Sequence, residues 1–255
     1  MSEALADLTE DAFLGGQLRL KQKRSGHRAG HDAILLAAAT EARAGDRVVD
    51  LGAGIGTAGL ALARRVAGIK LGLVEIDSEL AELARANAAA NAIAAETIVL
   101  DVTADAQAFA ASGLAPDSVD VVLMNPPFND PARHRGSSDQ ARQIAHVATD
   151  ETLNAWVHAA RRILRSNGAL TLIWRADGIA EVLAALSRGF GSLAILPVHG
   201  EAGRPAIRVL VRAVKGGRAP ARLLPGLVLN EESRVPKEVM DILEGRTVLP
   251  LVEPC

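Results

Sequence analysis

Four consecutive residues, Asn125 to Phe128, combine an amide, two prolines and an aromatic ring. Pro126 and Pro127 fix two φ angles and donate no backbone hydrogen bond, so they hold Asn125 rigidly. The Asn125 side-chain oxygen and the Pro126 carbonyl can accept both hydrogens of a planar NH₂ group, while the Phe128 ring stacks on the attached base. The quartet predicts a site that binds an exocyclic amine and makes its nitrogen nucleophilic. The competing interpretation is a proline-stiffened loop with Phe128 in the core.

A glycine-rich turn is expected between a strand-like run that contains Asp50 and a helical run. Gly52, Gly54 and Gly56 stand at alternate positions. Glycine there lets the backbone approach a ligand closely, and the helix N-terminus that follows offers free N–H groups. The nicotinamide fingerprint needs a glycine at position 57, where this chain has threonine, so the pattern disfavours a dinucleotide.

Carboxylates stand at the ends of the next strand-like runs. Glu75 is placed where a carboxylate can accept hydrogen bonds from two ribose hydroxyls, and Asp77 and Asp101 lie at neighbouring strand ends. Each acid alone is equally compatible with a helix cap. Together with the glycine turn, these acids predict a site for a nucleoside.

Strand and helix patterns alternate around these residues, which is typical of an α/β fold with parallel strands and crossover helices. The helix expected at 153–164 carries a one-sided apolar stripe that includes Trp156, and Gly168 is expected just beyond its end. We expect three parts, residues 1–45, 46–216 and 217–255, the middle one being the catalytic domain. Strands are expected at 47–51, 69–75, 97–100, 119–124, 169–174, 193–198 and 206–214, with a short strand-like run at 227–229, and further helices at 57–66, 78–91 and 237–243.

Composition excludes several classes of protein. Cys255 is the single cysteine, so neither a disulfide nor a cysteine metal site can form within the chain, and we expect no metal. HExxH, GxSxG and P-loop motifs are missing, which disfavours metalloprotease, hydrolase and nucleotide-triphosphatase functions. No apolar run approaches the roughly 20 residues that span a bilayer, and residues 1–11 are acidic without a cation, unlike a leader. We therefore expect a cytoplasmic protein that makes no contact with a membrane.

The net charge of −2 conceals two basic segments without acids. Charge runs are usually solvated faces, but two of them in a near-neutral chain predict contact with phosphates. In the second segment, 204–222, Arg208 and Arg212 should project from the same side of one strand. The first segment contains Arg19, Lys21, Lys23, Arg24 and Arg28.

These motifs resemble the class I S-adenosylmethionine (AdoMet)-dependent methyltransferases, in the branch with an (Asn/Asp)-Pro-Pro-(Tyr/Phe/Trp) motif that methylates exocyclic or amide nitrogens. The run from Gly26 to Leu36, the glycine turn, Glu75, the Asn-Pro-Pro-Phe quartet and the tail Leu229-Asn-Glu-Glu are similar to the bacterial enzymes that methylate N6 of the adenine next to the anticodon of valine tRNA. The resemblance implies a Rossmann-like fold whose seven-stranded, mostly parallel sheet has helices on both faces.

The resemblance also implies roles for individual residues. His31 stands where relatives tend to have a small hydroxyl residue, and Phe128 where tyrosine is commoner, but neither change removes a required acceptor or ring. The implied set is Gly52, Gly54 and Gly56 with Asp50 at the methionine part of AdoMet, Glu75 at its ribose, Asp101 at its adenine amine, Gly30, His31 and Asp32 over its amino-acid end, and Asn125 to Phe128 around the target base.

The function that follows from the resemblance is AdoMet-dependent methylation of N6 of an unpaired tRNA adenine by direct displacement. The tRNA would be held by the first basic segment and by Arg208 and Arg212. The alternatives are N5 methylation of a glutamine in a protein, as in release-factor methyltransferases, methylation of another RNA base amine, and a cofactor-binding scaffold without transfer. Only about 45 residues precede the glycine turn, which leaves no room for the N-terminal helical domain of the glutamine enzymes.

Overall fold

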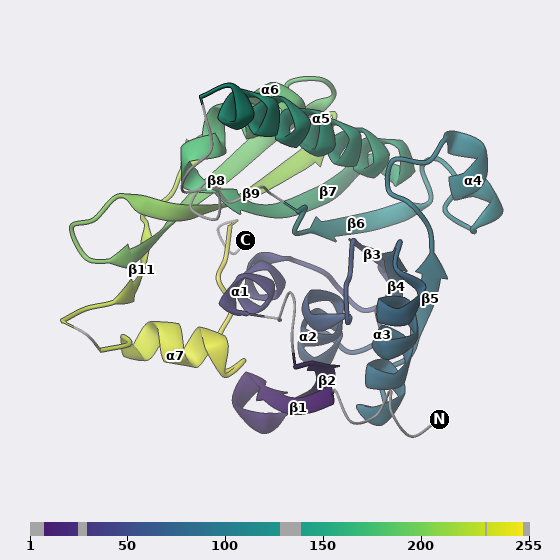
Figure 1. Cartoon of the computed structure of the whole chain (residues 1–255), viewed down its shortest axis with the longest axis horizontal. Helices are drawn as coiled ribbons and strands as arrows, with labels where there is room; N and C mark the ends of the chain where they lie inside the picture. The colour runs from purple at the N-terminus through teal and green to yellow at the C-terminus, as the bar shows by residue number, and fades with distance from the viewer. Residues whose placement is uncertain (1–7, 25–29, 128–138, 233, 252–255) are drawn as a thin grey trace.

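A twisted central sheet organises the molecule in the computed structural model, which describes residues 8–24, 30–127, 139–232 and 234–251, with the backbone alone for 139–150. The strand order is β10-β8-β9-β7-β6-β3-β4-β5, with β11 also paired to β8 (Figure 1). Strands β5, β4, β3, β6 and β7 pair in parallel, and β9 is antiparallel to both β7 and β8. The bounds are β3 Arg47–Leu51, β4 Lys70–Glu75, β5 Ala95–Val99, β6 Val119–Met124, β7 Leu164–Arg175, β8 Phe190–Glu201, β9 Ala206–Lys215, β10 Arg222–Leu223 and β11 Leu227–Asn230.

The expected α/β class and the seven expected strands are confirmed, but the count of seven for the whole sheet is wrong. Two short strands add in parallel to the outer side of β8: β10, which was not expected, and β11, which matches the strand-like run at 227–229. Since β8 is twelve residues long, its outer edge would otherwise expose a row of unpaired N–H and C=O groups. The short strands cover that edge.

Helices cover both faces of the sheet, as expected (Figure 1). The helices on one face are α1 His31–Ala39, α2 Thr57–Arg65 and α3 Ser78–Ala90, with α7 Lys237–Leu243 beside α1; those on the other are α4 Ala106–Ala111, α5 Asp139–Ile163 and α6 Ile179–Leu186. One apolar cluster, which includes Leu35 and Leu60, lies under the first group, and another, which includes Trp156 and Val182, lies under the second. None of the helices in the described part of the chain is long and apolar enough to cross a membrane.

The expected helix cap at Gly168 is wrong, because α5 ends at Ile163 and β7 begins directly after it. Gly168 is a strand residue instead. A Cβ there would lie 2.9 Å from the Arg165 carbonyl oxygen and 3.0 Å from that of Asp120, so only glycine fits the close approach to β6.

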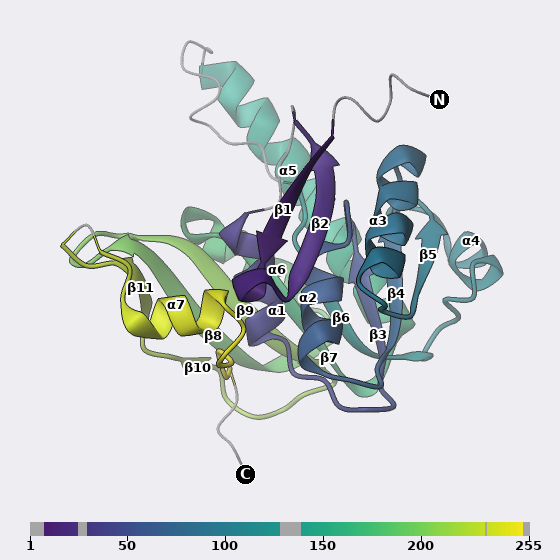
Figure 2. The same cartoon turned by 90° about the horizontal axis from the view of Figure 1, so that it is seen from below.

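A separate antiparallel hairpin of β1 (Leu8–Phe13) and β2 (Leu18–Lys23) lies outside the layer formed by α2 and α3 (Figure 2). The side chains of β2 alternate between buried Leu18 and Leu20 and exposed Arg19 and Lys21. The hairpin therefore buries its leucines against the helices and leaves cations at the surface.

Candidate active site

The carboxyl ends of β3, β4 and β6 bring the principal predicted residues together. Leu51 of β3 pairs with Val74 of β4 on one side and with Met124 of β6 on the other. The glycine turn, Glu75 and Asn125 each begin directly after one of these paired residues, so they meet at one edge of the sheet. Ligands of open α/β sheets bind at this edge.

The three glycines of the turn all have positive φ, from 56° to 89°. A Cβ at Gly52 would lie 2.1 Å from the Trp156 ring, and one at Gly56 would lie 3.0 Å from Leu60. A Cβ at Gly54 would meet nothing within 4 Å. Gly54 is thus the point at which a ligand can approach the backbone, whereas Gly52 makes room for Trp156 of α5. The sequence indicated Trp156 only as part of an apolar helix stripe.

Glu75 is 7% exposed and held in one orientation by two backbone N–H groups. Its Oε2 accepts from Gly54 N at 2.8 Å and its Oε1 accepts from Asp77 N at 3.0 Å. Each carboxylate oxygen can still accept another hydrogen bond, as a ribose diol requires. Asp77 caps α3 by accepting from the N–H groups of Glu79 and Leu80.

Asp50 is almost fully buried and supports the turn from below. Its Oδ2 accepts from Gly59 N at 2.8 Å, which ties β3 to α2. Burial raises the pKa of Asp50 to about 7; the Gly59 hydrogen bond opposes this rise and the charge of Glu75 adds to it. The carboxyl group therefore changes its charge near neutral pH.

Asp101 and Ile76 flank the far side of the edge. Asp101 is exposed and its Oδ1 accepts from both the N–H and the hydroxyl of Thr103. The Leu100 N–H donates to the Glu75 carbonyl, which brings the two acidic residues to adjacent strand ends. Ile76, directly after Glu75, is 62% exposed, and its side chain offers an apolar surface to a base. Sequence reasoning did not single out this exposed side chain, although its position directly after Glu75 could have suggested it.

Asn125 follows β6, and its Oδ1 is buried with no hydrogen-bond partner among the described residues. A buried acceptor without a partner costs about 1–3 kcal/mol. Pro126 is buried and Pro127 exposed, while Phe128 lies outside the described residues. The predicted amine-binding quartet thus offers a buried acceptor at the ligand-binding edge.

The start of α1 is tied to β9. Gly30 is the N-cap of α1, His31 is its exposed first residue, and the Asp32 carboxylate lies 2.9 Å from Arg208 Nε. Arg208 and Arg212 do project from one side of β9, as expected, and Arg212 lies 3.9 Å from Glu41. Their charges are partly buried and paired with acids of the α1 region rather than solvated.

The first basic segment is more open than the second. Arg19 pairs with Glu10 at 3.3 Å and Lys23 with Glu79 at 2.7 Å. The side chains of Lys21 and Arg24 are exposed and bond to no other described residue, and Arg28 lies outside the described part. No group of three or more metal-ligating side chains occurs within the described ranges.

Curated relatives match the chain over most of its length. The tRNA1(Val) (adenine(37)-N6)-methyltransferase of Dickeya chrysanthemi is 28% identical over 89% of this chain and 90% of its own. The protein of the same name from Aeromonas hydrophila is 30% identical over 80% of this chain and 84% of its own. A release factor glutamine methyltransferase of Chlorobaculum tepidum is 26% identical, over 58% of this chain and 52% of its own.

Solved structures with the same architecture are also methyltransferases. A predicted O-methyltransferase of Agrobacterium tumefaciens is 33% identical, with a TM-score of 0.71 over 86% of this chain and 98% of its own. A 16S rRNA N2 G1207 methyltransferase of T. thermophilus, solved with AdoMet and guanosine, is similar in fold, with 21% identity and a TM-score of 0.56 over 82% of this chain and 50% of its own. The family model described as methyltransferase small domain matches residues 28–200, more than half of the chain. Because that model covers the glycine turn, Glu75 and Asn125, which lie at one edge of the sheet, the chain belongs to the methyltransferase small domain family.

Proposed function

We propose that this methyltransferase transfers the methyl group of AdoMet to the exocyclic N6 amine of an unpaired adenine in tRNA. The observation that carries the proposal is the buried Asn125 Oδ1, which has no partner within the described residues and needs a donor such as an amine. The curated relatives that match this chain over most of their own length are named for this reaction. The match to the glutamine enzyme covers about half of that protein, which favours the tRNA adenine.

The cofactor fits the edge formed by β3, β4 and β5. Glu75 is already oriented to accept from a ribose diol, and the open space at Gly54 admits the methionine part between Gly52 and Gly56. When bound, AdoMet supplies an electrophilic methyl carbon on a sulfonium. Ile76 offers an apolar surface to the adenine ring. In the same proposal Asp101 accepts from the adenine amine, Asp50 supports the turn, and Gly30, His31 and Asp32 close over the amino-acid end.

In this site, catalysis consists of holding the amine in position for attack on the methyl carbon. Asn125 Oδ1 and the Pro126 carbonyl accept the two amine hydrogens, which turns the nitrogen lone pair towards the methyl carbon. Pro127 stiffens the loop, and Phe128 stacks on the base. No strong general base is required, because the amine loses its proton after it has attacked. A loop adenine costs little to unstack, which suits an unpaired base.

The tRNA backbone would be met by the hairpin. Strand β2 runs along α3, from Asn91 at the end of the helix to Glu79 near its start. Glu79 follows Glu75 by four residues in the chain. The cations at the end of β2 therefore lie close to the sheet edge at which we propose that the reaction takes place. In this proposal the phosphates are bound by Arg19, Lys21, Lys23, Arg24 and Arg28.

The three parts of the chain have separate roles in the same proposal. Residues 1–45 close over the cofactor site of the methyltransferase domain, 46–216, and residues 217–255 form an appendage packed on that domain. Because the substrate is tRNA, we place the protein in the cytoplasm.

The decisive experiment incubates the protein with AdoMet and unmodified tRNA and identifies the methylated nucleoside by mass spectrometry. We expect N6-methyladenosine, and its loss from the tRNA of a strain that lacks this chain. A release factor offered in the same assay tests the glutamine acceptor. Methylation of a release-factor glutamine, or of another base, in place of adenine N6 would overturn the proposal.

A further inference from the structure

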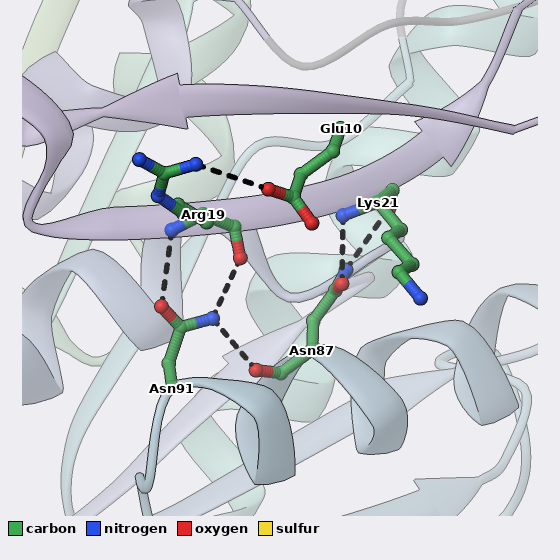
Figure 3. Close-up of polar contacts among 5 residues, drawn as sticks. All are labelled: Glu10, Arg19, Lys21, Asn87 and Asn91. Carbon is green, nitrogen blue, oxygen red and sulfur yellow. Dashed lines mark hydrogen bonds and ion pairs between the residues drawn. The ribbon is translucent and has the colours of Figure 1, made fainter.

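Two asparagines, one in α3 and one at its C-cap, bind the backbone of β2 as though they were a neighbouring strand (Figure 3). Asn91 accepts from Arg19 N at 3.0 Å and donates to Arg19 O at 2.7 Å. One helical turn earlier, Asn87 accepts from Lys21 N at 2.8 Å and donates to Lys21 O at 3.1 Å. Both backbone groups of both strand residues are thus satisfied by side-chain amides.

The spacing explains why two asparagines suffice. Four helical residues advance about 6 Å and two strand residues about 6.7 Å, so side chains four apart on α3 meet alternate residues of β2. A primary amide carries one carbonyl acceptor and an N–H donor, the same pair that a strand presents. The amides also fix the register of β2, since a slip by one residue would bury its cations and expose its leucines.

Each asparagine makes a third bond, but only that of Asn87 leaves the helix: Asn91 Nδ2 donates to the Asn87 carbonyl oxygen at 2.8 Å, whereas Asn87 reaches the glycine turn. Its Nδ2 also donates to the carbonyl oxygen of Ile55, at 3.1 Å, within the glycine turn. The side chain is 1% exposed, so these bonds are shielded from water. One buried amide thus bridges the backbone of Lys21, between the hairpin cations, to the loop proposed to hold the cofactor.

We propose that Asn87 is a positioning residue that couples the two ligand sites, so that AdoMet and tRNA bind cooperatively. The inference rests on the proposed function. A cofactor that orders the glycine turn also fixes Ile55 O, and through Asn87 it orders the backbone of β2. Ordering of one side lowers the entropic cost of ordering the other, and the coupling is reciprocal.

Hydrogen exchange on the unmodified protein tests the link without a mutation. S-adenosylhomocysteine, the product form of the cofactor, should slow exchange of the Arg19 and Lys21 amides of β2 by about fivefold or more, although neither residue belongs to the cofactor site. Unchanged exchange in β2 at saturating ligand would overturn the inference. No binding of the ligand at all would instead refute the proposed function, so the two failures are distinguishable.

Substitutions of Asn87 and of Asn91, its matched control, test which asparagine carries the coupling between the two ligands. For the wild type, saturating unmodified tRNA should tighten S-adenosylhomocysteine binding by about fivefold or more, within the usual range of coupling between sites. Asn87→Ala should reduce this factor to below about twofold and weaken ligand binding without tRNA by about tenfold, because the Ile55 carbonyl loses its buried partner. Asn91→Ala loosens the same strand without touching the glycine turn, so it should weaken tRNA binding but keep most of the coupling.

Equal loss of coupling in both variants, or full coupling in Asn87→Ala, would overturn the inference. Asn87→Asp serves where the alanine variant does not fold, since it can still accept from Lys21 N but donates to neither carbonyl. It should lose the coupling as the alanine variant does, and retention of the wild-type factor would count against the bridge.

Discussion

At the scale of single residues, the Asn125 side chain makes the sharpest prediction. Its acceptor matters most when the amine nitrogen becomes pyramidal, so Asn125→Ala should lower kcat about 100-fold and leave AdoMet affinity nearly unchanged. Asn125→Asp retains an acceptor oxygen and should keep a larger share of the turnover. Single-turnover methylation of tRNA with each variant measures this. Wild-type turnover by the alanine variant would refute the role.

Glu75 should act on cofactor affinity rather than on turnover. Its carboxylate is already oriented by two backbone N–H groups, so Glu75→Ala should weaken AdoMet binding by about 1.5–3 kcal/mol, the scale of a hydrogen bond to a charged group. Glu79→Ala removes an exposed carboxylate nearby and serves as the control. Calorimetry measures the AdoMet affinity of each variant. A Glu75→Ala affinity equal to that of the wild type would exclude Glu75 from the site.

The glycines of the turn differ in what each accommodates. Gly52→Ala should destabilise the fold by about 3 kcal/mol or more, since its methyl group would overlap the Trp156 ring and its φ is positive. Gly54→Ala meets open space, so it should cost only about 1–2 kcal/mol of backbone strain and mainly weaken cofactor binding. Thermal unfolding and calorimetry separate the two effects; equal stabilities of the two variants would contradict this difference.

The same residues mark what sequence can show about a site. The spacing of Gly52, Gly54 and Gly56 after a strand was enough to predict a turn close to a ligand. It could not show that Gly52 is required by Trp156, because that contact joins positions about one hundred residues apart. Nor could it show that Asn87 and Asn91 bind a strand, since asparagine in a helix carries no local pattern.

At the scale of elements, buried strands were predictable and the hairpin was not. Strands β3 and β6 were placed correctly because β6 is a nearly continuous apolar run and β3 ends directly at the glycine turn. The six-residue strands β1 and β2 mix charges with leucines, and β2 is held by side chains of α3 that only the fold brings near. Gly168 shows the same limit, since a glycine after a helix pattern indicates a cap unless a neighbouring strand is known.

The stability of the protein should depend on pH because of Asp50, which lies at the junction of β3 with α2. Its folded pKa of about 7 lies above the ordinary value of 3.8, so the folded state binds a proton that the unfolded state releases. Stability of the ligand-free protein should therefore fall as pH rises from about 4 to 7, by on the order of 4 kcal/mol from this group. Asp50→Asn should remove that contribution.

Urea unfolding at pH 5 and pH 8 measures the difference. The asparagine oxygen can still accept from Gly59 N, so the variant should keep the fold and be more stable than the wild type at pH 8. Asp46→Asn, in the turn before β3, is the control for loss of one carboxylate. The same change in stability with pH for Asp50→Asn and the wild type would contradict the assignment.

At the scale of the whole molecule, function depends on where charge lies rather than on its total. A net charge of −2 gives no attraction for RNA, yet the outer face of the hairpin carries cations, and Lys23 among them lies at the start of α3 beside Glu79. The arginines of β9, which the sequence suggested as a second RNA surface, pair with Asp32 near the start of α1 and with Glu41 just beyond its end, and their contact with RNA stays a prediction.

Binding of tRNA should consequently depend steeply on salt, and the hairpin should carry that dependence. Each phosphate neutralised contributes about 0.7–0.9 to the slope of log affinity against log salt, so replacing Lys21, Lys23 and Arg24 by alanine should reduce the slope by about 2. AdoMet affinity should change little, because Glu75 and the glycine turn remain intact. The control removes the same charge from Arg43, Lys70 and Arg188, three exposed cations at the opposite edge of the sheet, and should keep the wild-type slope. Filter binding between low and physiological salt gives the slopes. Equal slopes for the wild type and the hairpin variant would identify the hairpin cations as a solvated face and remove the tRNA backbone from this surface.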